Sequence, residues 1–467
     1  MTILSKTPLT DFQVVILAAG QGTRMKSALP KVLHPLAGKP LLAHVVDTAR
    51  TLNAGQLCIV HGHGAEQVRQ AVQGNDLKYV LQAEQKGTGH ALLQALPALS
   101  KAAVTLVLYG DVPLIRCETL ESLLGACGKG IAVLTADLLD PSGYGRILRN
   151  RSGKISGIVE DKDATAVQKR IREINTGILA LPTSRLKVWL SQLSPRNRQG
   201  ELYLTDVIAM AVRDKLPVTA VQAADVSEVE GINTRAQLAA MERAFQMRAA
   251  RTLMDSGVTL SDPSRFDQRG VLTHGRDVSI DVNCLFEGKV HLGDNVSIGA
   301  NCVLRDVTIA AGSRIEPFTL IDSAAVGEQC RIGPYARVRP GTVLDDDVHI
   351  GNFVEVKASR IGRSSKANHL AYVGDSEVGR DVNIGAGTIT CNYDGASKHR
   401  TIIEDNVHIG SDVQLVAPVR IARDTTIGAG TTVWQDTAAG GLVLNPKSQQ
   451  QRDSWRRPKK KSSPKNS

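Results

Sequence analysis

An aliphatic residue returns at every sixth position through much of the second half of the chain. One unbroken series runs from Val326 through Ile332 and Val338 to Val356, and glycine often follows the aliphatic residue, as at Gly327. A six-residue period is typical of a parallel β-helix, in which each short strand directs one aliphatic side chain inward and a small residue lets the chain turn. We therefore predict a β-helix of hexapeptide repeats from about residue 270, each coil covering the apolar face of the next.

The same period occurs in two further registers and is interrupted twice. One register runs from Leu292 to Leu304 and the other from Ile403 to Val433. The period breaks near 361–377 and 390–402, and we expect both segments to be irregular loops. Insertions in a solenoid usually form surface loops, where binding and catalytic residues are often found.

The first half of the chain has a different pattern. Short apolar runs alternate with segments of helical periodicity such as 41–52 and 88–99. Runs of this length, buried on both faces, are typical of a mostly parallel sheet covered by helices. This half is predicted to be an α/β domain of the Rossmann-like, doubly wound type. The four apolar runs are Gln13–Ala18, Leu57–Val60, Ala103–Tyr109 and Ile131–Thr135.

A helix is expected between these two halves. Residues 236–254 contain neither Gly nor Pro and are rich in Ala, Leu, Met, Glu and Arg, which favours one continuous helix. A chain of 467 residues is also too long for a single ordinary core. The predicted organisation is an α/β domain over 1–235, a helical linker over 236–256, and a β-helix domain with a basic tail over 257–467.

Composition narrows the class of protein. No run of about 18 apolar residues is present, so we expect no membrane insertion. Residues 1–11 lack the long apolar run of a signal peptide. The seven cysteines are an odd number without CxxC spacing, which favours free thiols in a reducing compartment. We therefore expect a cytoplasmic protein.

The net charge of +10 lies partly in the tail, Trp455–Lys465. A solvated, disordered end is one interpretation of such a tail, and attraction of phosphorylated ligands is another. Nucleic-acid binding is not predicted, because basic residues interleaved with aromatic ones and a recognisable nucleic-acid-binding fold are both missing.

The segment Leu17–Ser27, followed by Lys31, carries the clearest chemistry. Small residues after a strand let backbone N–H groups approach a nucleotide closely. Arg24 and Lys31 then supply two cations where a polyphosphate would lie, and such cations stabilise the charge that develops in phosphoryl transfer. The spacing differs from the Walker A motif, and Gly20-Gln-Gly22 lacks the third glycine of a dinucleotide-binding fingerprint.

The segment Leu17–Lys31 resembles the signature loop of nucleotide-sugar pyrophosphorylases. With a β-helix behind it, nearly the whole chain resembles the bacterial family of bifunctional uridyltransferase/acetyltransferases, whose rear domain is a left-handed parallel β-helix. The resemblance implies acetyl transfer from acetyl-CoA to glucosamine 1-phosphate, followed by uridylyl transfer from UTP to N-acetylglucosamine 1-phosphate with release of pyrophosphate. It also implies a homotrimer, and a product, UDP-N-acetylglucosamine, that feeds peptidoglycan and lipopolysaccharide synthesis.

The resemblance assigns roles to residues of the front domain. Catalytic cations would act at the phosphates, a loop would hold the uridine nucleotide, and Mg²⁺ would bind two oxygen ligands, Asp111 and Asn233. Mg²⁺ prefers oxygen ligands and usually takes few from the protein. The residues assigned to catalysis are Arg24 and Lys31. Those assigned to the nucleotide are Leu17, Ala18, Ala19, Gly20, Lys31, Gln82, Gly87, Thr88, Tyr109, Gly110 and Asp111. Those assigned to the amino sugar are Gly145, Glu160 and Asn175, and Asn233 is assigned to the metal with Asp111.

In the rear domain the resemblance implies that His369 is the catalytic base. A histidine of ordinary pKa suits a base near neutrality. Glu355 could orient this histidine or could be a salt-bridge partner, and the sequence leaves both alternatives open. The residues assigned to glucosamine 1-phosphate are Arg339, Lys357, Tyr372 and Asn383, and those assigned to acetyl-CoA are Ala386, Asn392, Tyr393, Ser411 and Ala429.

One position departs from the family. An arginine that contacts acetyl-CoA is expected after the last coils, but Pro446 stands there. Lys447 could substitute as a point charge without the planar fork of arginine, and Arg452, Arg456 and Arg457 are other candidates. The alternative to a bifunctional enzyme is a sugar-phosphate nucleotidyltransferase in which the β-helix is only an oligomerisation scaffold.

Overall fold

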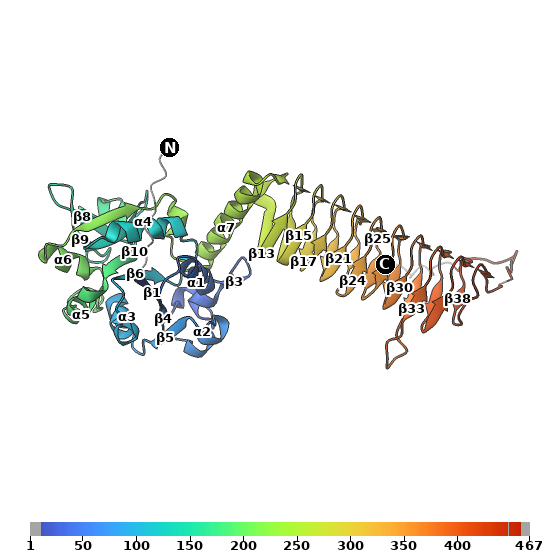
Figure 1. The fold of residues 1–467 in the computed structure, drawn as a ribbon, viewed down its shortest axis with the longest axis horizontal. Coiled ribbons are helices and arrows are strands. Elements are labelled where there is room, and N and C mark those ends of the chain that lie inside the picture. Colours follow the sequence, from blue (N-terminus) through green and yellow to red (C-terminus); the bar gives the residue numbers. More distant parts are fainter. Residues whose placement is uncertain (1–10, 447, 459–467) are drawn as a thin grey trace, which may run out of the picture. The chain divides into compact units, whose positions relative to one another are not determined.

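The computed structural model describes residues 11–446 and 448–458, which form two compact units (Figure 1). The first unit comprises Met1–Thr252 with Phe266–Gly270, and the second comprises Leu253–Arg265 with Val271–Ser467. Helix α7 (Arg235–Asp255) contains the stretch without Gly and Pro. Within the described residues, no helix combines the length and the hydropathy needed to cross a membrane.

The first unit contains a mostly parallel sheet with helices on both sides, as predicted. Its strand order is β11-β7-β10-β6-β1-β4-β5, and β10 runs antiparallel to β6 and β7. The strands are β1 (Phe12–Ala18), β4 (Leu57–His61), β5 (Leu77–Leu81), β6 (Val104–Tyr109), β7 (Ile131–Asp137), β8 (Gly145–Arg149), β9 (Ile155–Val159), β10 (Glu173–Pro182) and β11 (Val218–Gln222), with a small hairpin of β2 (Pro35–Leu36) and β3 (Lys39–Pro40). The helices are α1 (Leu41–Thr51), α2 (Ala65–Ala71), α3 (Thr88–Ala95), α4 (Cys117–Cys127), α5 (Thr183–Ser191) and α6 (Asp206–Arg213).

Strand β1 runs through the middle of the sheet and explains why its sequence is continuously apolar. Successive side chains point to opposite faces, so Val14 and Ile16 enter the core cluster that includes residues of α1 and α4. Val15 and Leu17 enter the cluster that includes residues of α3, α5 and α6. All seven residues of β1 are buried, and the strand is therefore a rigid base for the loop that follows it.

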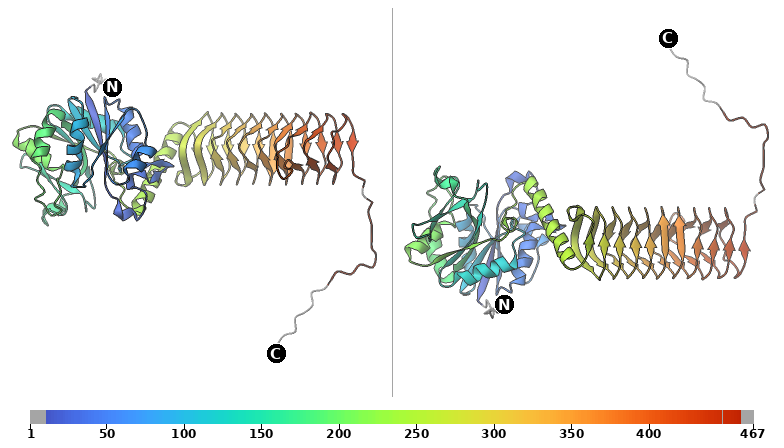
Figure 2. Two further views of the ribbon diagram at one scale, coloured as in Figure 1. Left: turned by 90° about the horizontal axis from the view of Figure 1, so that it is seen from below. Right: turned by 90° about the horizontal axis from the view of Figure 1, so that it is seen from above.

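The second unit is the predicted left-handed parallel β-helix, whose strands stack coil upon coil (Figure 2). Ile280 pairs with Ile298, Ile298 with Ile315, and Ile315 with Ile332. One coil thus takes 17 or 18 residues, which is three hexapeptides. These isoleucines are buried, as the six-residue period predicts.

An 11-stranded sheet forms one face of the β-helix, and a 17-stranded sheet covers the other two. The first consists of β12 (Thr259–Leu260), β14 (Ser279–Ile280), β16 (Ser297–Ile298), β19 (Arg314–Ile315), β22 (Arg331–Ile332), β25 (His349–Asn352), β28 (Lys366–His369), β31 (Asn383–Ile384), β34 (His408–Ile409), β37 (Thr426–Ile427) and β39 (Leu442–Val443). The second consists of β13 (Phe266–His274), β15 (Cys284–Leu292), β17 (Val303–Arg305), β18 (Thr308–Ile309), β20 (Leu320–Asp322), β21 (Ala324–Val326), β23 (Arg337–Val338), β24 (Thr342–Leu344), β26 (Glu355–Lys357), β27 (Arg360–Ile361), β29 (Tyr372–Gly374), β30 (Ser376–Val378), β32 (Ile389–Cys391), β33 (Thr401–Ile403), β35 (Gln414–Val416), β36 (Val419–Ile421) and β38 (Thr432–Val433).

The expected loop at 361–377 is wrong, because this segment is a regular coil that contains β28 and β29. Ile350 pairs with Ala367, and Ala367 pairs with Ile384. These coils take 17 residues, and a buried Ala367 replaces the aliphatic residue, so the six-residue period is lost from the sequence while the fold continues.

The expected loop at 390–402 does leave the coil. It extends from the β-helix between β32 and β33 as a short hairpin (Figure 1), and Tyr393 bridges to Lys398 across it. The seven cysteines of the chain are all unpaired thiols.

Candidate active sites

The loop after β1 closes tightly over Lys31. Gly22 has a φ of 65°, and a Cβ at this position would lie 2.6 Å from the Cβ of Lys31. Only glycine meets both the backbone conformation and this close approach. The loop therefore holds the Lys31 side chain, which is 12% exposed, at the edge of the sheet.

The carboxyl ends of β1 and β6 meet at this edge. Leu17 pairs with Tyr109, and the backbone N–H of Gly110 donates to the carbonyl of Leu17 at 2.9 Å. A ligand crevice is expected outside the carboxyl ends of parallel strands. A cleft of about 880 Å³ lies there, and the residues assigned from the sequence that line it are Leu17, Ala18, Ala19, Gly20, Arg24, Lys31, Gln82, Gly87, Thr88, Tyr109, Asp111 and Asn233. Gly110 packs instead against Ala18, Val32 and Leu42.

Asp111 and Asn233 converge on one point, which the Lys31 ammonium marks. Lys31 Nζ lies 2.5 Å from Asp111 Oδ2 and 2.9 Å from Asn233 Oδ1. The backbone N–H of Ile232 donates to the carbonyl of Asp111 at 2.9 Å, which fixes the two segments together. Two oxygen atoms that share a cation in this way fit the donor set of Mg²⁺. No cluster of three His, Cys, Asp or Glu side chains suited to a metal occurs among residues 11–446 and 448–458.

The three residues assigned to the amino sugar come together near Tyr109, outside the residues that line the cleft. Asn175 on β10 pairs with Gly145 on β8. Glu160 accepts a hydrogen bond from Thr205 at 2.8 Å, and its Oε2 lies 3.4 Å from where a Cβ of Gly145 would stand. Burial raises the pKa of Glu160. Burial and the negative charge of Glu160 also raise the pKa of Tyr109.

Several residues of the cleft were not assigned from the sequence. Gln85 Nε2 donates to the carbonyl of Ala19 at 2.6 Å, so it ties the segment 82–89 to the nucleotide loop. A Cβ at Gly62 would lie 2.8 Å from the same carbonyl. His63 and Glu201 also line the cleft. Gln85 lies between Gln82 and Gly87, which the resemblance did assign. The others have no local signal, because strand neighbours far apart in sequence bring them there.

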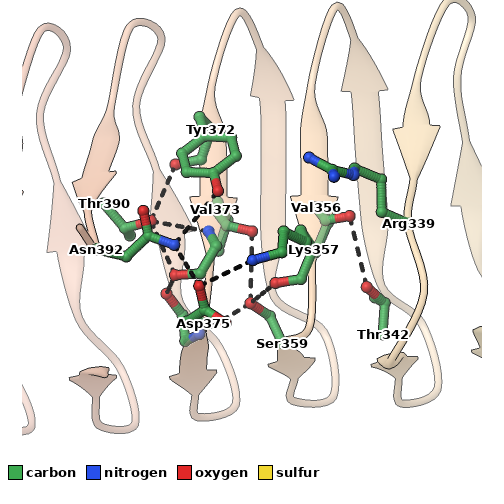
Figure 3. A network of polar contacts seen from close by, with 12 residues as sticks. Arg339, Thr342, Val356, Lys357, Ser359, Tyr372, Val373, Asp375, Thr390 and Asn392 are labelled. Carbon is green, nitrogen blue, oxygen red and sulfur yellow. Dashed lines mark hydrogen bonds and ion pairs between the residues drawn. The ribbon is translucent and has the colours of Figure 1, made fainter. Parts of the chain in front are cut away.

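Four side chains on neighbouring coils form a polar network on the β-helix (Figure 3). Lys357 Nζ lies 3.1 Å from Asp375 Oδ2. Asn392 donates to the same carboxylate oxygen, and its Nδ2 also lies 3.3 Å from the Tyr372 hydroxyl. A Cβ at Gly374 would lie 2.3 Å from that hydroxyl, so the Tyr372 ring lies directly over a glycine. Lys357 and Asn392 thus meet at Asp375, which was not assigned, and Asn392 in turn reaches Tyr372.

Arg339 and Lys398 add positive charge at this end of the site. Arg339 follows β23 and its Nη1 lies 2.7 Å from Glu355 Oε1, which raises the pKa of Arg339. Lys398, on the hairpin after β32, lies so close to Lys357 that the neighbouring ammonium lowers the pKa of Lys398. Arginine and lysine side chains held together in this way are suited to a phosphate group.

His369 ends strand β28 at an exposed corner of the β-helix, not in an irregular loop. Its Nδ1 lies 2.7 Å from Oδ1 of Asn352, the residue with which it pairs on the preceding coil. Glu355 bonds to Arg339 instead, so of the two alternatives for Glu355 the structure has the salt bridge.

The residues assigned to acetyl-CoA divide into two groups. Strand registers on both sides of the His369 corner place Ala386, Ser411 and Ala429 at the position equivalent to His369 on the next three coils. Asn392 and the exposed Tyr393 lie at the opposite edge of the same face, beside Lys357 and Asp375. Asn383 lies on β31, where it pairs with Lys366 of β28, the strand that ends at His369.

Pro446 is exposed and lies beyond the last strand, β39. The substitute cation considered for it, Lys447, lies outside the described residues. Arg452, Arg456 and Arg457 are exposed. The position at which the sequence analysis expected an arginine is therefore occupied by an exposed proline.

Comparisons with known proteins match both units. Residues 14–167 match the MobA-like NTP transferase domain, 269–366 the GMPPB C-terminal domain, and 400–433 the bacterial transferase hexapeptide (six repeats). Similar proteins include the "Bifunctional protein GlmU" of Paraburkholderia phytofirmans, 59% identical over 451 residues, and that of Paraburkholderia phymatum, 60% identical over 451 residues; each alignment covers 96% of this chain and 100% of the relative. The protein of the same name from Nitrosospira multiformis is 56% identical over 460 residues, covering 98% of this chain and 100% of the relative.

Proposed function

The chain belongs to the GlmU family, and from this premise we propose that it is a bifunctional enzyme of UDP-N-acetylglucosamine synthesis. The second unit transfers an acetyl group from acetyl-CoA to glucosamine 1-phosphate. The first unit then transfers a uridylyl group from UTP to the N-acetylated sugar phosphate and releases pyrophosphate. The observation that carries this proposal is that full-length similarity to bifunctional relatives coincides with two separate clusters of chemically suitable residues, one on each unit.

In the uridylyl transfer, the sugar phosphate itself is the nucleophile toward the α-phosphorus of UTP, so the protein needs to position the reactants and neutralise charge. Lys31 and Arg24 are the cations of the nucleotide loop, and Arg24 is exposed in the cleft. Asp111 and Asn233 would hold Mg²⁺. When bound, Mg²⁺ offsets phosphate charge. Lys31, which bonds Asp111 and Asn233, places its ammonium beside both proposed ligands, where the phosphates of UTP would lie.

In the acetyl transfer, His369 removes a proton from the amine of glucosamine 1-phosphate. The cations Arg339 and Lys357 hold its phosphate, with Tyr372 and Asn383 beside the sugar. Ala386, Ser411 and Ala429 have small side chains in one row with His369, and such a row leaves room for an extended acetyl donor. This supports the acetyl-CoA assignment along the coils beyond His369.

A homotrimer is part of the proposal. The acetyltransferase residues lie on the outer surface of a β-helix, and His369 itself is exposed, so another subunit would be needed to exclude water. Phe318, Tyr335 and Phe353 form a stacked aromatic row on neighbouring coils, with ring centroids 4.9 and 5.3 Å apart and each side chain about half exposed. Such a row favours burial in an assembly. Seven unpaired thiols support a reducing, cytoplasmic location.

The test supplies purified protein with glucosamine 1-phosphate, acetyl-CoA, UTP and Mg²⁺, and follows thiol release and pyrophosphate separately. Both products are expected, with thiol release first. Pyrophosphate formed only from N-acetylated sugar phosphate, with no thiol release, would instead identify a single-activity nucleotidyltransferase with a scaffold domain. His369→Ala should abolish thiol release and spare pyrophosphate formation, and sedimentation velocity should give a trimer.

A further inference from the structure

Asn352 and His369 face each other across neighbouring coils. They pair in the ladder between β25 and β28, and the backbone N–H of Leu370 donates to the carbonyl of Asn352 at 3.1 Å. The coils approach closely here, because a Cβ at Gly351 would lie 2.0 Å from the carbonyl oxygen of Asn368. Neighbouring parallel strands lie about 4.8 Å apart, so the two side chains stack in line and the 2.7 Å contact between Asn352 Oδ1 and His369 Nδ1 follows from the register.

The identity of the partner atom determines which nitrogen of the imidazole carries the proton. An amide oxygen has no hydrogen and can only accept, so Nδ1 of a neutral His369 donates to Asn352. Nε2 then keeps its lone pair. In water a neutral histidine side chain prefers the opposite tautomer, with the proton on Nε2, and a base in that state has no lone pair on the exposed nitrogen.

We infer that Asn352 is a positioning residue for acetyl transfer: its amide oxygen fixes the His369 ring so that Nε2 points outward with a free lone pair for the amine of glucosamine 1-phosphate. This inference rests on the proposed role of His369 as the base. The usual partner in such pairs is a carboxylate, which also stabilises the imidazolium. A neutral amide supplies the orientation and the tautomer without adding negative charge.

The polar groups on the strands around His369 are cationic, neutral, or acids that are paired with an arginine. His349 and Lys366 lie on the same two strands, and Arg331 pairs with His349 on the preceding coil. Glu316, the nearby acid, is bound to Arg331 at 3.0 Å. On the following strand, Asn383 is neutral. Glu355 is held by Arg339 at 2.7 Å. Within the described residues, the side-chain hydrogen bond of His369 is therefore the one to Asn352.

The test measures thiol release over pH 5.5–9 for the full-length trimer and for Asn352→Ala and Asn352→Asp. Because a general base contributes about 10²–10⁴-fold, Asn352→Ala should lower kcat about 10-fold or more, while the KM for glucosamine 1-phosphate stays within about twofold. A carboxylate close to the ring favours the protonated imidazole, so Asn352→Asp should move the acidic limb of the kcat profile upward by about one pH unit. Pyrophosphate formation by the first unit serves as the control within each molecule.

Asn301→Asp is the matched substitution. Asn301 bonds Asn283 on the neighbouring coil at 3.1 Å and lies four coils before His369, so its profile should coincide with the wild type. Histidine-selective ¹⁵N spectra, with the His369 signal identified by its loss in His369→Gln, supply a readout besides activity. They should show the proton of the neutral ring on Nδ1 in the wild type and on Nε2 in Asn352→Ala.

Two results would overturn the inference: a kcat for Asn352→Ala equal to that of the wild type, or an acidic limb for Asn352→Asp that coincides with that of Asn301→Asp. If His369→Ala retains thiol release, the proposed function of the site fails. If His369→Ala abolishes thiol release but Asn352→Ala does not lower it, the positioning role alone fails.

Discussion

Gly374→Ala tests whether the position of Tyr372 matters for acetyl transfer. The added Cβ would lie 2.3 Å from the Tyr372 hydroxyl and 2.6 and 2.8 Å from two ring carbons, whereas ordinary contacts are 3.4–4 Å. Because the φ of Gly374 is not positive, alanine suits the backbone, and the three atoms nearest to its Cβ all belong to Tyr372. The ring must therefore move away from Asn392 and from the sugar site.

The loss should appear in substrate affinity. Displacing Tyr372 removes about one hydrogen bond, worth about 0.5–1.5 kcal/mol, so the KM for glucosamine 1-phosphate should rise about 2- to 12-fold in the thiol-release assay. Pyrophosphate formation should not change. Gly441→Ala is the control, because its Cβ would meet only the carbonyl oxygen of Ala438, at 3.4 Å.

A double-mutant cycle separates this explanation from general damage to the coil. In a Tyr372→Ala background the Cβ at position 374 has no ring to displace, so Gly374→Ala should have no further effect on KM. An equal rise in KM in both backgrounds would refute the reasoning. So would a loss of stability of the second unit by about 1–3 kcal/mol, as expected for an overpacked core, seen as a lower melting temperature.

Three further predictions concern the first unit. Gly22→Ala should lower pyrophosphate formation and leave thiol release unchanged, because it combines a φ of 65° with a 2.6 Å approach to Lys31; Gly125→Ala, which meets nothing within 4 Å, should have no effect on either product. Asp111→Asn should raise the Mg²⁺ concentration needed for half-maximal pyrophosphate formation, and a chelator should stop that reaction while thiol release continues. Burial raises the pKa of Glu160 above its ordinary value of 4.5, so the native state retains this proton to higher pH than the unfolded chain does. The native state therefore loses stability as the pH rises from 4.5. Glu160→Gln should flatten this decline in thermal melts of the full chain between pH 4.5 and 7.

Much of the fold and part of the sites could be predicted from local pattern. A six-residue period requires inward aliphatic side chains, and Ile298, Ile315 and Ile332 are buried one above another. The nucleotide loop was also predictable, because a strand followed by small residues and two cations is a local arrangement. These features depend only on residues that are near neighbours in the chain, so the sequence by itself determines them.

The partners of the site residues were decided by tertiary structure. Lys31 meets Asn233 across 202 positions of sequence, because the order of strands in the sheet brings their loops together. Which residues stack on the β-helix depends on the length of each coil: the step from Ile350 to Ala367 and on to Ile384 is 17 residues, but the step from Ile384 to Ile409 is 25, because a hairpin leaves the coil between them. A one-residue change in such a step would remove Asn352 from His369, and this is why the sequence alone left Glu355 open as the partner of the base.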